Sequence, residues 1–240
     1  MGLLAMASAG SEFTVRIACL ANSRKWSGRC VAGKELDGAG RWVRPVSLRP
    51  TREVAEAEQQ YADGAAPAVL DIVEIPCTGR APAGHQIENV VVDSRFYWKR
   101  LGRVDWRTLC AMVDRDSMLW TNGHQSQHGQ NNRVPQRLLR PQEGSLRLIA
   151  LDRVVLDAGP KAPELGDQKR VVRATFEYRG AGYRLAVTDP RVEAYCLAAG
   201  DGQYTFGSVL ACVSLGEIFE GHAYKLVASL ITRKVAERNG

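Results

Sequence analysis

The stretch CLANSRKWSGRCVAGKELDGAGRWVRPVSLRP, residues 19–50, decides how this chain folds. It continues an apolar, β-branched run that starts at Thr14 and is typical of a strand. The glycines at its turns, including the Asp-Gly-Ala-Gly run at residues 37–40, suit tight hairpins. Three short strands are therefore expected, over residues 14–21, 29–33 and 41–47. This pattern indicates a β-meander rather than an alternation of strands and helices.

The same kind of pattern continues along the rest of the chain. Further short strands are expected over residues 69–76, 87–93, 146–156, 171–178, 181–188, 209–215 and 224–231. Helical spacing predicts one helix over residues 105–115, with Asp105 as its N-cap. A second helix is expected over residues 190–199, because Asp189 or Thr188 suits the N-cap and Pro190 suits the first turn. The fold class is therefore mostly β with a few short helices, in two β-rich sections that suggest small barrels or sandwiches.

The chain carries its positive charge near its beginning. Of 240 residues, 45% are hydrophobic and 24% are charged, which is ordinary for a globular protein. Residues 14–50 contain eight Arg or Lys against two Asp or Glu, a surplus that equals the net charge of +6 of the whole chain. Such a surplus favours an anionic partner, most often nucleic acid or a nucleotide. A merely solvated basic surface would give the same count.

Composition also indicates the cellular compartment in which we expect the protein. No segment approaches the roughly 18 consecutive apolar residues of a membrane span, so no membrane partner is expected. The six cysteines form no CxxC pair, and most lie in apolar runs, which indicates buried reduced thiols and a cytoplasmic protein. Residues 1–13 match nothing that follows, and their Gly-Ser-Glu-Phe end is what a cloning junction often encodes. We expect a cloning-derived tail there.

Five motifs carry a resemblance to a known family. They are NSRKWSGRCVAGKEL (22–36), WVRPVS (42–47), WTNGHQSQHGQNNRV (120–134), VTDP (187–190) and CVSLGEIFEGHAYKLVASLI (212–231). With these motifs the chain resembles the bacterial dual OB-fold domain family over nearly its whole length from Val15. The resemblance implies two OB-like β-barrels packed together: a first over residues 14–140, with a helix and a long polar loop, and a second over residues 141–240. It further implies a role in nucleic-acid binding and assigns no catalytic residue.

The first candidate site is the basic and aromatic segment near the start of the chain. Several cations on one face gain affinity for phosphates by displacing counterions, and tryptophan rings stack on bases. This combination on a small barrel is typical of proteins that bind single-stranded nucleic acid. The alternative is that Trp42 lies in the core and the arginines are only solvated around the rim. The candidate residues are Asn22, Arg24, Lys25, Trp26, Arg29, Lys34, Trp42 and Arg44.

The second candidate site is the polar loop over residues 119–135. Its side-chain amides are suited to reading base edges or sugar hydroxyls, and its arginine is suited to a phosphate. The candidate residues are Asn122, Ser126, Asn131 and Arg133. The alternative is an Ω-loop that hydrogen-bonds to itself and fills the space between the domains.

Metal and catalytic sites have weaker signals. His124 and His128 are four residues apart, but the flanking glycines argue against a helix that would place both on one face. We expect no metal and no cofactor. The chain lacks the motifs of α/β-hydrolases, P-loop NTPases, kinases and zinc deaminases. Glu217 is the one weak catalytic candidate, and an ion pair with an arginine of the first barrel is the preferred interpretation of it.

The leading hypothesis is a module that binds single-stranded or structured RNA or DNA through a basic and aromatic barrel face. Whether the chain is an enzyme stays open, and a binding role without catalysis is preferred. The alternative is a sensor or enzyme that acts on a nucleotide-like small anion in a pocket between the barrels. An open basic groove would favour the first hypothesis, and a closed pocket would favour the second.

Overall fold

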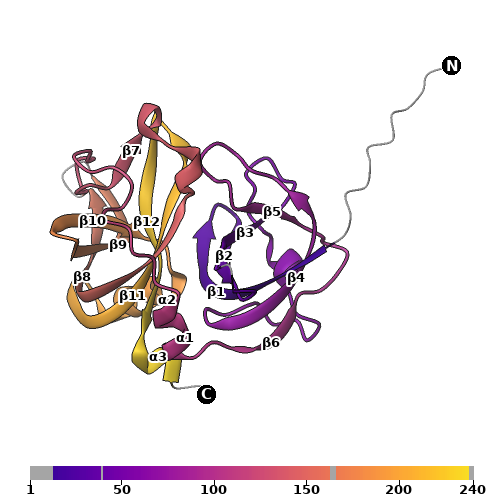
Figure 1. The fold of residues 1–240 in the computed structure, drawn as a ribbon. Coiled ribbons are helices and arrows are strands. Elements are labelled where there is room, and N and C mark those ends of the chain that lie inside the picture. Colours follow the sequence, from indigo (N-terminus) through magenta and orange to yellow (C-terminus); the bar gives the residue numbers. More distant parts are fainter. Residues whose placement is uncertain (1–12, 39, 163–165, 238–240) are drawn as a thin grey trace.

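The computed structural model describes residues 13–38, 40–162 and 166–237. The expected cloning-derived tail, apart from Phe13, lies outside the described residues. Phe13 itself begins the first strand, where it pairs with Cys77. The strands form two six-stranded sheets, which lie side by side (Figure 1).

The first sheet closes into a barrel. Its strands are β1 (Phe13–Lys25), β2 (Gly28–Glu35), β3 (Trp42–Val46), β4 (Asp71–Arg80), β5 (Asn89–Val92) and β6 (Lys99–Arg103). They hydrogen-bond in the order β1-β2-β3-β5-β4, and β4 pairs again with β1, which closes a ring of five strands. Strands β3 and β5 pair in parallel and the other pairs of the ring are antiparallel. Strand β6 extends the sheet beyond β4.

The second sheet repeats this topology. Its strands are β7 (Arg133–Pro135), β8 (Leu146–Ala162), β9 (Asp167–Tyr178), β10 (Ala181–Val187), β11 (Gly202–Phe219) and β12 (His222–Thr232). The ring runs β8-β9-β10-β12-β11 and back to β8, again with one parallel pair, β10 with β12. Strands β8–β12 therefore take the places of β1–β5, and each ring has the five strands of an OB fold. The predicted mostly-β fold with two OB-like barrels is confirmed.

The apolar run in β1 is continuous because the strand faces two cores. Neighbouring residues of a strand point to opposite faces. Ile17 lies in the core of the first barrel, whereas Ala18 lies in a third core at the seam between the barrels. On the other side of the seam, Cys212 of β11 faces the same seam core and Val213 faces the core of the second barrel. Both strands are therefore buried on both faces.

Main-chain hydrogen bonds also join the barrels. The backbone nitrogen of Arg24 donates to the carbonyl oxygen of Thr188 at 3.0 Å, and that of Asp114 donates to Leu148 at 2.8 Å. Together with the seam core, these bonds make the two barrels one packed unit.

Short helices lie at the ends of strands and near the seam. Helix α1 (Trp106–Ala111) begins at Asp105, whose carboxylate accepts from the backbone of Thr108 at 2.7 Å. Helix α2 (Pro190–Ala199) begins at Asp189, which accepts from the backbone of Arg191 at 3.0 Å. Both predicted N-caps are confirmed, but α1 ends before residue 115 because Asp114 already bonds to the second barrel. The 3-10 turn at Glu56–Gln59 lies within residues 53–61, where the polar sequence suggests one or two helical turns. Helix α3 (Arg233–Glu237) was not expected, nor were the 3-10 turns at Gln136–Leu138 and Pro141–Glu143.

The polar loop packs on the second barrel. Strand β7 at its end pairs with β12, and Leu119, Trp120 and Val134 lie in the core of the second barrel. We expected this loop in the first barrel, with a boundary at residue 140. The apolar residues at both ends of the loop instead carry it onto the second barrel, so the chain crosses the seam before residue 119.

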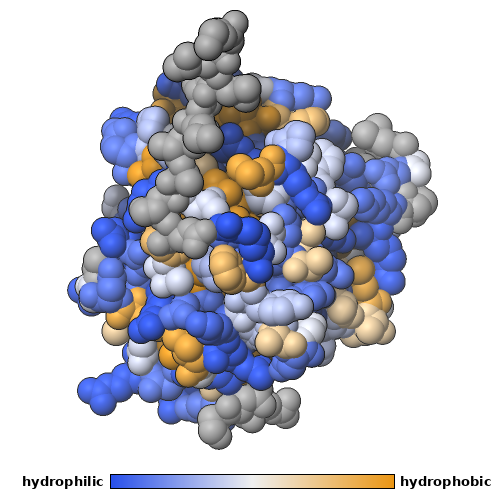
Figure 2. All heavy atoms as spheres, turned by 90° about the vertical axis from the view of Figure 1, so that its right-hand side faces the viewer, coloured by the Kyte–Doolittle hydropathy of each residue, from blue (hydrophilic) through white to orange (hydrophobic). Residues whose placement is uncertain are grey.

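The view onto the first barrel in Figure 2 shows a mostly hydrophilic surface, on which apolar side chains form small separate patches. Among the described helices, none is long and apolar enough to cross a membrane.

Candidate functional site

Carboxylates, all but one of them from outside residues 14–50, lie close to the basic residues of the opening stretch. Each of the eight Arg and Lys side chains in residues 14–50 has an Asp or Glu oxygen within 4.0 Å. The pairs are Arg16–Glu74, Arg24–Glu193, Lys25–Glu217, Arg29–Glu56, Lys34–Asp114, Arg41–Glu35, Arg44–Glu88 and Arg49–Glu58. The positive charge that is concentrated in this stretch of the sequence is therefore paired with carboxylates in the folded protein.

Lys34 and Trp42 hold the seam rather than an open surface. The buried Lys34 Nζ lies 2.5 Å from Asp114 Oδ1 and donates to the carbonyl of Met112 at 2.7 Å. Trp42 Nε1 donates to Asp114 Oδ2 at 3.1 Å, and the same oxygen accepts from the backbone of Leu148 in β8 at 2.8 Å. Asp114 thus ties β2 and β3 to the second barrel. Lys34 and Trp42, which we predicted to bind a ligand, instead hold the two barrels together. For Trp42 this outcome is close to the alternative that it lies in the core.

The polar loop bonds to itself and to the second barrel. Asn131 Nδ2 donates to the carbonyl of Gly182 at 2.9 Å, and Asn122 Oδ1 accepts from Tyr183 Oη at 2.8 Å. Ser126 bonds through its backbone and hydroxyl to the amide of Asn132. These contacts follow the self-bonded alternative, and they use the amide groups that we expected to face a ligand. Arg133 lies in β7 on the edge of the second sheet.

A buried lysine anchors this loop. Lys225 is 1% exposed, and its Nζ donates to the carbonyl of Thr121 at 2.7 Å and lies 5.2 Å from the centre of the Tyr183 ring. Burial, which penalises the ammonium, lowers the pKa of Lys225 to about 7. The sequence carried a signal for it, because alternation along β12 places Lys225 on the inward face with Ala223 and Val227.

The opening stretch meets the second barrel where two hairpins approach each other. Trp26 lies at the tip of the β1–β2 hairpin and is 74% exposed, and Phe219 at the end of β11 is 62% exposed. Both side chains line one hollow of about 330 Å³, which we call the hairpin hollow. Lys25 Nζ lies 2.7 Å from Glu217 Oε1 across it. Glu217 therefore pairs with a lysine of the first barrel rather than with an arginine.

Two further hollows extend this one along the seam. A hollow of about 410 Å³ beside α2 shares Arg24 and Trp26 with the hairpin hollow. A third, of about 400 Å³, shares Arg29 with the second and reaches Asn22. We call the three together the seam groove. It brings together six of the predicted binding residues and Glu217, and the six are Asn22, Arg24, Lys25, Trp26, Arg29 and Arg44.

A buried ion pair lies beneath the hairpin hollow. Arg44 lines the hollow but is only 3% exposed, and its Nη2 lies 3.3 Å from Glu88 Oε1. Glu88 also accepts from the hydroxyl of Ser145. Nearby, His85 Nε2 donates to the carbonyl of Gly216 at 2.8 Å, and burial lowers the pKa of this imidazole. These contacts fix the β4–β5 loop of the first barrel against β11 of the second.

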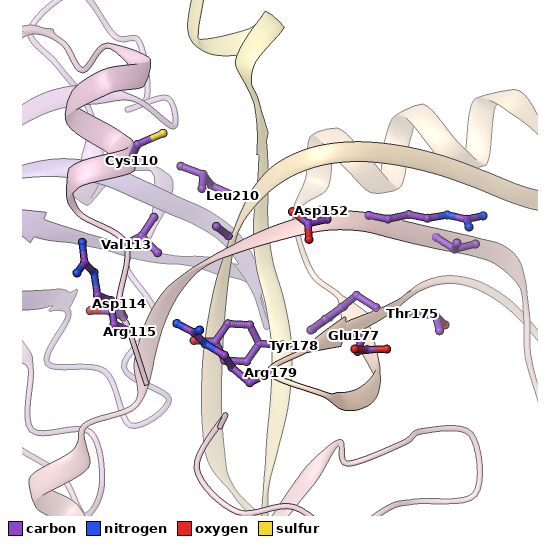
Figure 3. A pocket seen from close by; sticks show the side chains of 14 residues that line it. Cys110, Val113, Asp114, Arg115, Asp152, Thr175, Glu177, Tyr178, Arg179 and Leu210 are labelled. Atoms are coloured by element: carbon purple, nitrogen blue, oxygen red, sulfur yellow. The ribbon is translucent and has the colours of Figure 1, made fainter. Parts of the chain in front are cut away.

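A much larger hollow, of about 1190 Å³, lies where the segment after α1 meets the second barrel (Figure 3). The segment after α1 forms one wall, with Val113 and Arg115, and strands β8 and β9 form the other. We call this hollow the arginine groove, because it is lined by three arginines, Arg115, Arg153 and Arg179. Among the described residues, none of the three has a carboxylate partner. Sequence reasoning missed this group because the three residues lie far apart along the chain.

In the described part of the chain, no three His, Cys, Asp or Glu side chains are placed to hold a metal ion.

Comparison with known proteins bears on the fold and not on the seam groove. No match was found among curated proteins. The family described as the Dual OB-containing domain matches residues 15–230, which is nearly the whole chain and includes both rings of strands. The chain therefore belongs to the dual OB-containing domain family.

Proposed function

We propose that this protein binds single-stranded nucleic acid along the seam groove. The observation that carries the proposal is the pair of exposed aromatic rings, Trp26 and Phe219, which two different barrels place on one hollow. Base stacking on an aromatic ring contributes about 1–3 kcal/mol per base and tolerates any sequence. Two such rings, with cations between and beside them, suit a strand whose bases stack on the rings while its phosphates contact the cations.

Folding does not account for Trp26. Its backbone φ is +47°, in the left-handed region that favours glycine and disfavours bulky residues. A large apolar ring at this strained and exposed position costs stability and buries almost nothing. Strain of this kind is concentrated at functional sites, so it supports a binding role for the hairpin tip.

The ion pairs of the groove do not prevent phosphate binding. Lys25–Glu217 and Arg24–Glu193 each include a partly exposed partner, and exposed pairs contribute only about 0–1 kcal/mol. A phosphate oxygen therefore exchanges with the carboxylate at small cost. Arg24 and Lys25 therefore remain available to a polyanion even though each has a carboxylate partner in the free protein.

The position of the groove also fits the fold. OB barrels bind oligonucleotides across strands 2 and 3 and the loops that join strands 1–2 and 4–5. In the first barrel these loops contain Trp26 and Gln86, and both residues line the hairpin hollow. The loops of the first barrel thus lie at the same hollow as the exposed aromatic pair, which remains the main support for the function.

A second candidate function is the binding of a nucleotide-like small anion. The observation that favours it is the volume of the hairpin hollow, about 330 Å³, which lies within the usual range for small-molecule sites. The groove is continuous with two more hollows, which favours a longer ligand over a single nucleotide.

Fluorescence anisotropy with labelled 15-mers of RNA and DNA tests the proposal. Trp26→Ala and Phe219→Ala are each expected to weaken binding roughly 5- to 150-fold, as the loss of one stacked base requires. Tyr97→Ala is the matched control, since Tyr97 is 61% exposed but lies outside the seam groove. Undetectable binding of the wild type at low salt, or an equal loss in the Tyr97 variant, would overturn the proposal.

A further inference from the structure

A bulge in β11 presents Glu217 to the hairpin hollow. The register against β12 shifts between Leu215 and Ile218, so β11 carries one residue more than its partner there. Bulges of this kind re-aim a side chain and are frequent beside functional sites. The alternation of inward and outward side chains ends at the bulge, and Glu217, Ile218 and Phe219 are all exposed. A carboxylate therefore lines the hollow together with an exposed ring.

The first barrel holds this bulge in place. His85 Nε2 donates to the carbonyl of Gly216 at 2.8 Å, and Gln86 Nε2 donates to the carbonyl of Leu215 at 3.4 Å. Both donors lie in the β4–β5 loop, on the other side of the seam. The backbone that leads into Glu217 is thus fixed before any ligand arrives. A group that is positioned in advance loses little freedom on binding.

Glu217 keeps hydrogen-bonding capacity that the fold does not use. Its side chain is 44% exposed, and Oε1 contacts Lys25 Nζ at 2.7 Å. Among the described residues, Oε2 has no hydrogen-bond partner. An ionised carboxylate accepts hydrogen bonds and donates none. The free oxygen therefore suits a ligand group that donates.

Phosphate binding increases this need for a donor. In the proposed function, a phosphate oxygen replaces Glu217 at the ammonium of Lys25. The carboxylate is then left without its cation and lies close to a negatively charged strand. A hydrogen-bond donor on the same nucleotide offsets this loss, because hydrogen bonds to charged groups are stronger than those between neutral groups.

The ribose 2′-hydroxyl is such a donor, and deoxyribose lacks it. Carboxylates bind ribose hydroxyls in known nucleotide sites, as in the dinucleotide-binding Rossmann fold. In the hairpin hollow, Trp26 and Phe219 offer ring faces to a base, and Lys25 offers an ammonium to a phosphate. With Glu217 for the sugar, the base, phosphate and ribose of one nucleotide each meet a group of matching chemistry.

We propose that the seam groove selects RNA over DNA, with Glu217 accepting a hydrogen bond from a ribose 2′-hydroxyl in the hairpin hollow. The inference rests on the proposed binding of single strands and adds the kind of sugar that the strand carries. Deoxyribose at the same place leaves the displaced carboxylate without a donor. The selection acts on the sugar, so it holds for any base.

Anisotropy with labelled 15-mers of uridine and of deoxyuridine tests this inference, since the two strands differ only in the 2′-hydroxyl. The wild type is expected to bind the RNA strand about 10-fold more tightly. This is near the lower end of what one hydrogen bond to a charged group provides, because Glu217 is partly exposed. A DNA strand with one central ribose is expected to recover most of the difference. A 2′-fluoro strand keeps the ribose pucker but lacks the donor, so it is expected to bind like DNA.

Three variants identify the acceptor. Glu217→Met removes it, and the two strands are expected to bind equally. Glu217→Gln removes the charge but keeps an acceptor, so a preference of roughly 3-fold is expected to remain. Both changes remove the same charge beside Lys25, so both are expected to strengthen binding of either strand. Glu237→Met is the matched control, since this exposed carboxylate pairs with Arg233 outside the seam groove, and it is expected to keep the wild-type preference.

The outcomes separate this inference from the proposed function. Equal affinity of the wild type for the RNA and DNA strands overturns the selection of ribose and leaves strand binding intact. A preference for RNA that persists in Glu217→Met, or binding of the 2′-fluoro strand as tight as that of RNA, overturns the hydrogen bond to Glu217. Failure of the wild type to bind either strand overturns both proposals.

Discussion

Lys25 Nζ lies 2.7 Å from Glu217 Oε1 and so joins the first hairpin of one barrel to a strand of the other. The two residues are separated by most of the chain, and each lies in a motif that the resemblance to the family singled out. Their pairing places the hairpin tip with Trp26 against the β11–β12 hairpin and creates the hollow between them.

Lys25→Met tests whether this lysine contacts a phosphate. The slope of log affinity against log salt is expected to become shallower by about 0.7, which is the contribution of one phosphate contact with a single strand. Stability is expected to change by less than about 1 kcal/mol, because the pair is partly exposed. Salt titrations and urea unfolding measure the two effects. Arg100→Met, which removes an exposed pair with Asp63 outside the groove, is expected to leave the slope unchanged.

Asp114→Ala tests the anchor of the seam. The substitution leaves the ammonium of Lys34 buried without its counter-ion and removes the acceptor of Trp42 Nε1. Loss of one partner of a buried pair costs about 3–5 kcal/mol, and urea unfolding is expected to show a loss near the lower end of that range. Asp152→Ala, an exposed carboxylate in the arginine groove, is the control and is expected to change stability by about 0.5 kcal/mol at most. Equal losses would contradict this role for Asp114.

Lys225→Met tests the buried lysine through pH. The pKa of Lys225 is about 7 in the folded protein and about 10.4 when unfolded, so the unfolded chain binds more protons between these values. The cost of burying the ammonium is therefore complete below pH 7 and is relieved as pH rises toward 10. Relative to the variant, the wild type is expected to gain stability over this window, by roughly 1.4 kcal/mol per pH unit at most.

Urea unfolding at pH 6.5, 8 and 9.5 measures this difference. Lys234→Met, at an exposed position on α3, is the matched control and is expected to follow the wild type. Parallel pH curves for the wild type and the Lys225 variant would rule out a desolvated ammonium at this position.

Gly33→Ala tests the close contact between β1 and β2. A Cβ at residue 33 would lie 2.1 Å from the carbonyl oxygen of Ala18, so the two strands would have to separate. A loss of about 1–3 kcal/mol or more is expected, as for other overpacked sites. No described atom lies within 4 Å of a Cβ built at Gly79 in β4, and Gly79→Ala is expected to be nearly neutral. Thermal unfolding of the two variants makes the comparison.

Alkylation of cysteines tests which groove holds the strand. Cys30 lines the hairpin hollow and Cys110 lines the arginine groove, and both are accessible. Bound oligonucleotide is expected to slow the reaction of Cys30 with iodoacetamide and to leave Cys110 unchanged. Burial raises the pKa of Cys19 to about 12, so this thiol serves as an unreactive internal control. Protection of Cys110 alone would move the ligand to the arginine groove, and peptide mapping by mass spectrometry distinguishes the two.

Much of the fold could be predicted because its signals are local. The caps at Asp105 and Asp189 depend on residues within three positions of each carboxylate, and both formed as expected. The end of α1 and the docking of the polar loop depend on contacts with the second barrel, so residue spacing did not reveal them.

The candidate site was predicted in part for the same reason. Trp26 and Arg24 lie on a hairpin whose tip is set by the local sequence, and both line the seam groove. Lys34 and Trp42 are likewise a basic and an aromatic residue, but the fold turns both side chains toward Asp114. Nothing in the spacing of Arg115, Arg153 and Arg179 indicates that they share a groove.

The sequence by itself determined the short strands, the turns, the helix starts and membership of a family with two OB barrels. Each of these follows from side-chain alternation, backbone preferences or motifs that are read along the chain. Only the tertiary structure decided which charges are matched and which rings face one hollow. The reason is that an ion pair depends on distance in space, and the partner of Lys25 lies at residue 217, on another barrel. The charge of the opening stretch is thus a property of the sequence, and its availability to a ligand is a property of the fold.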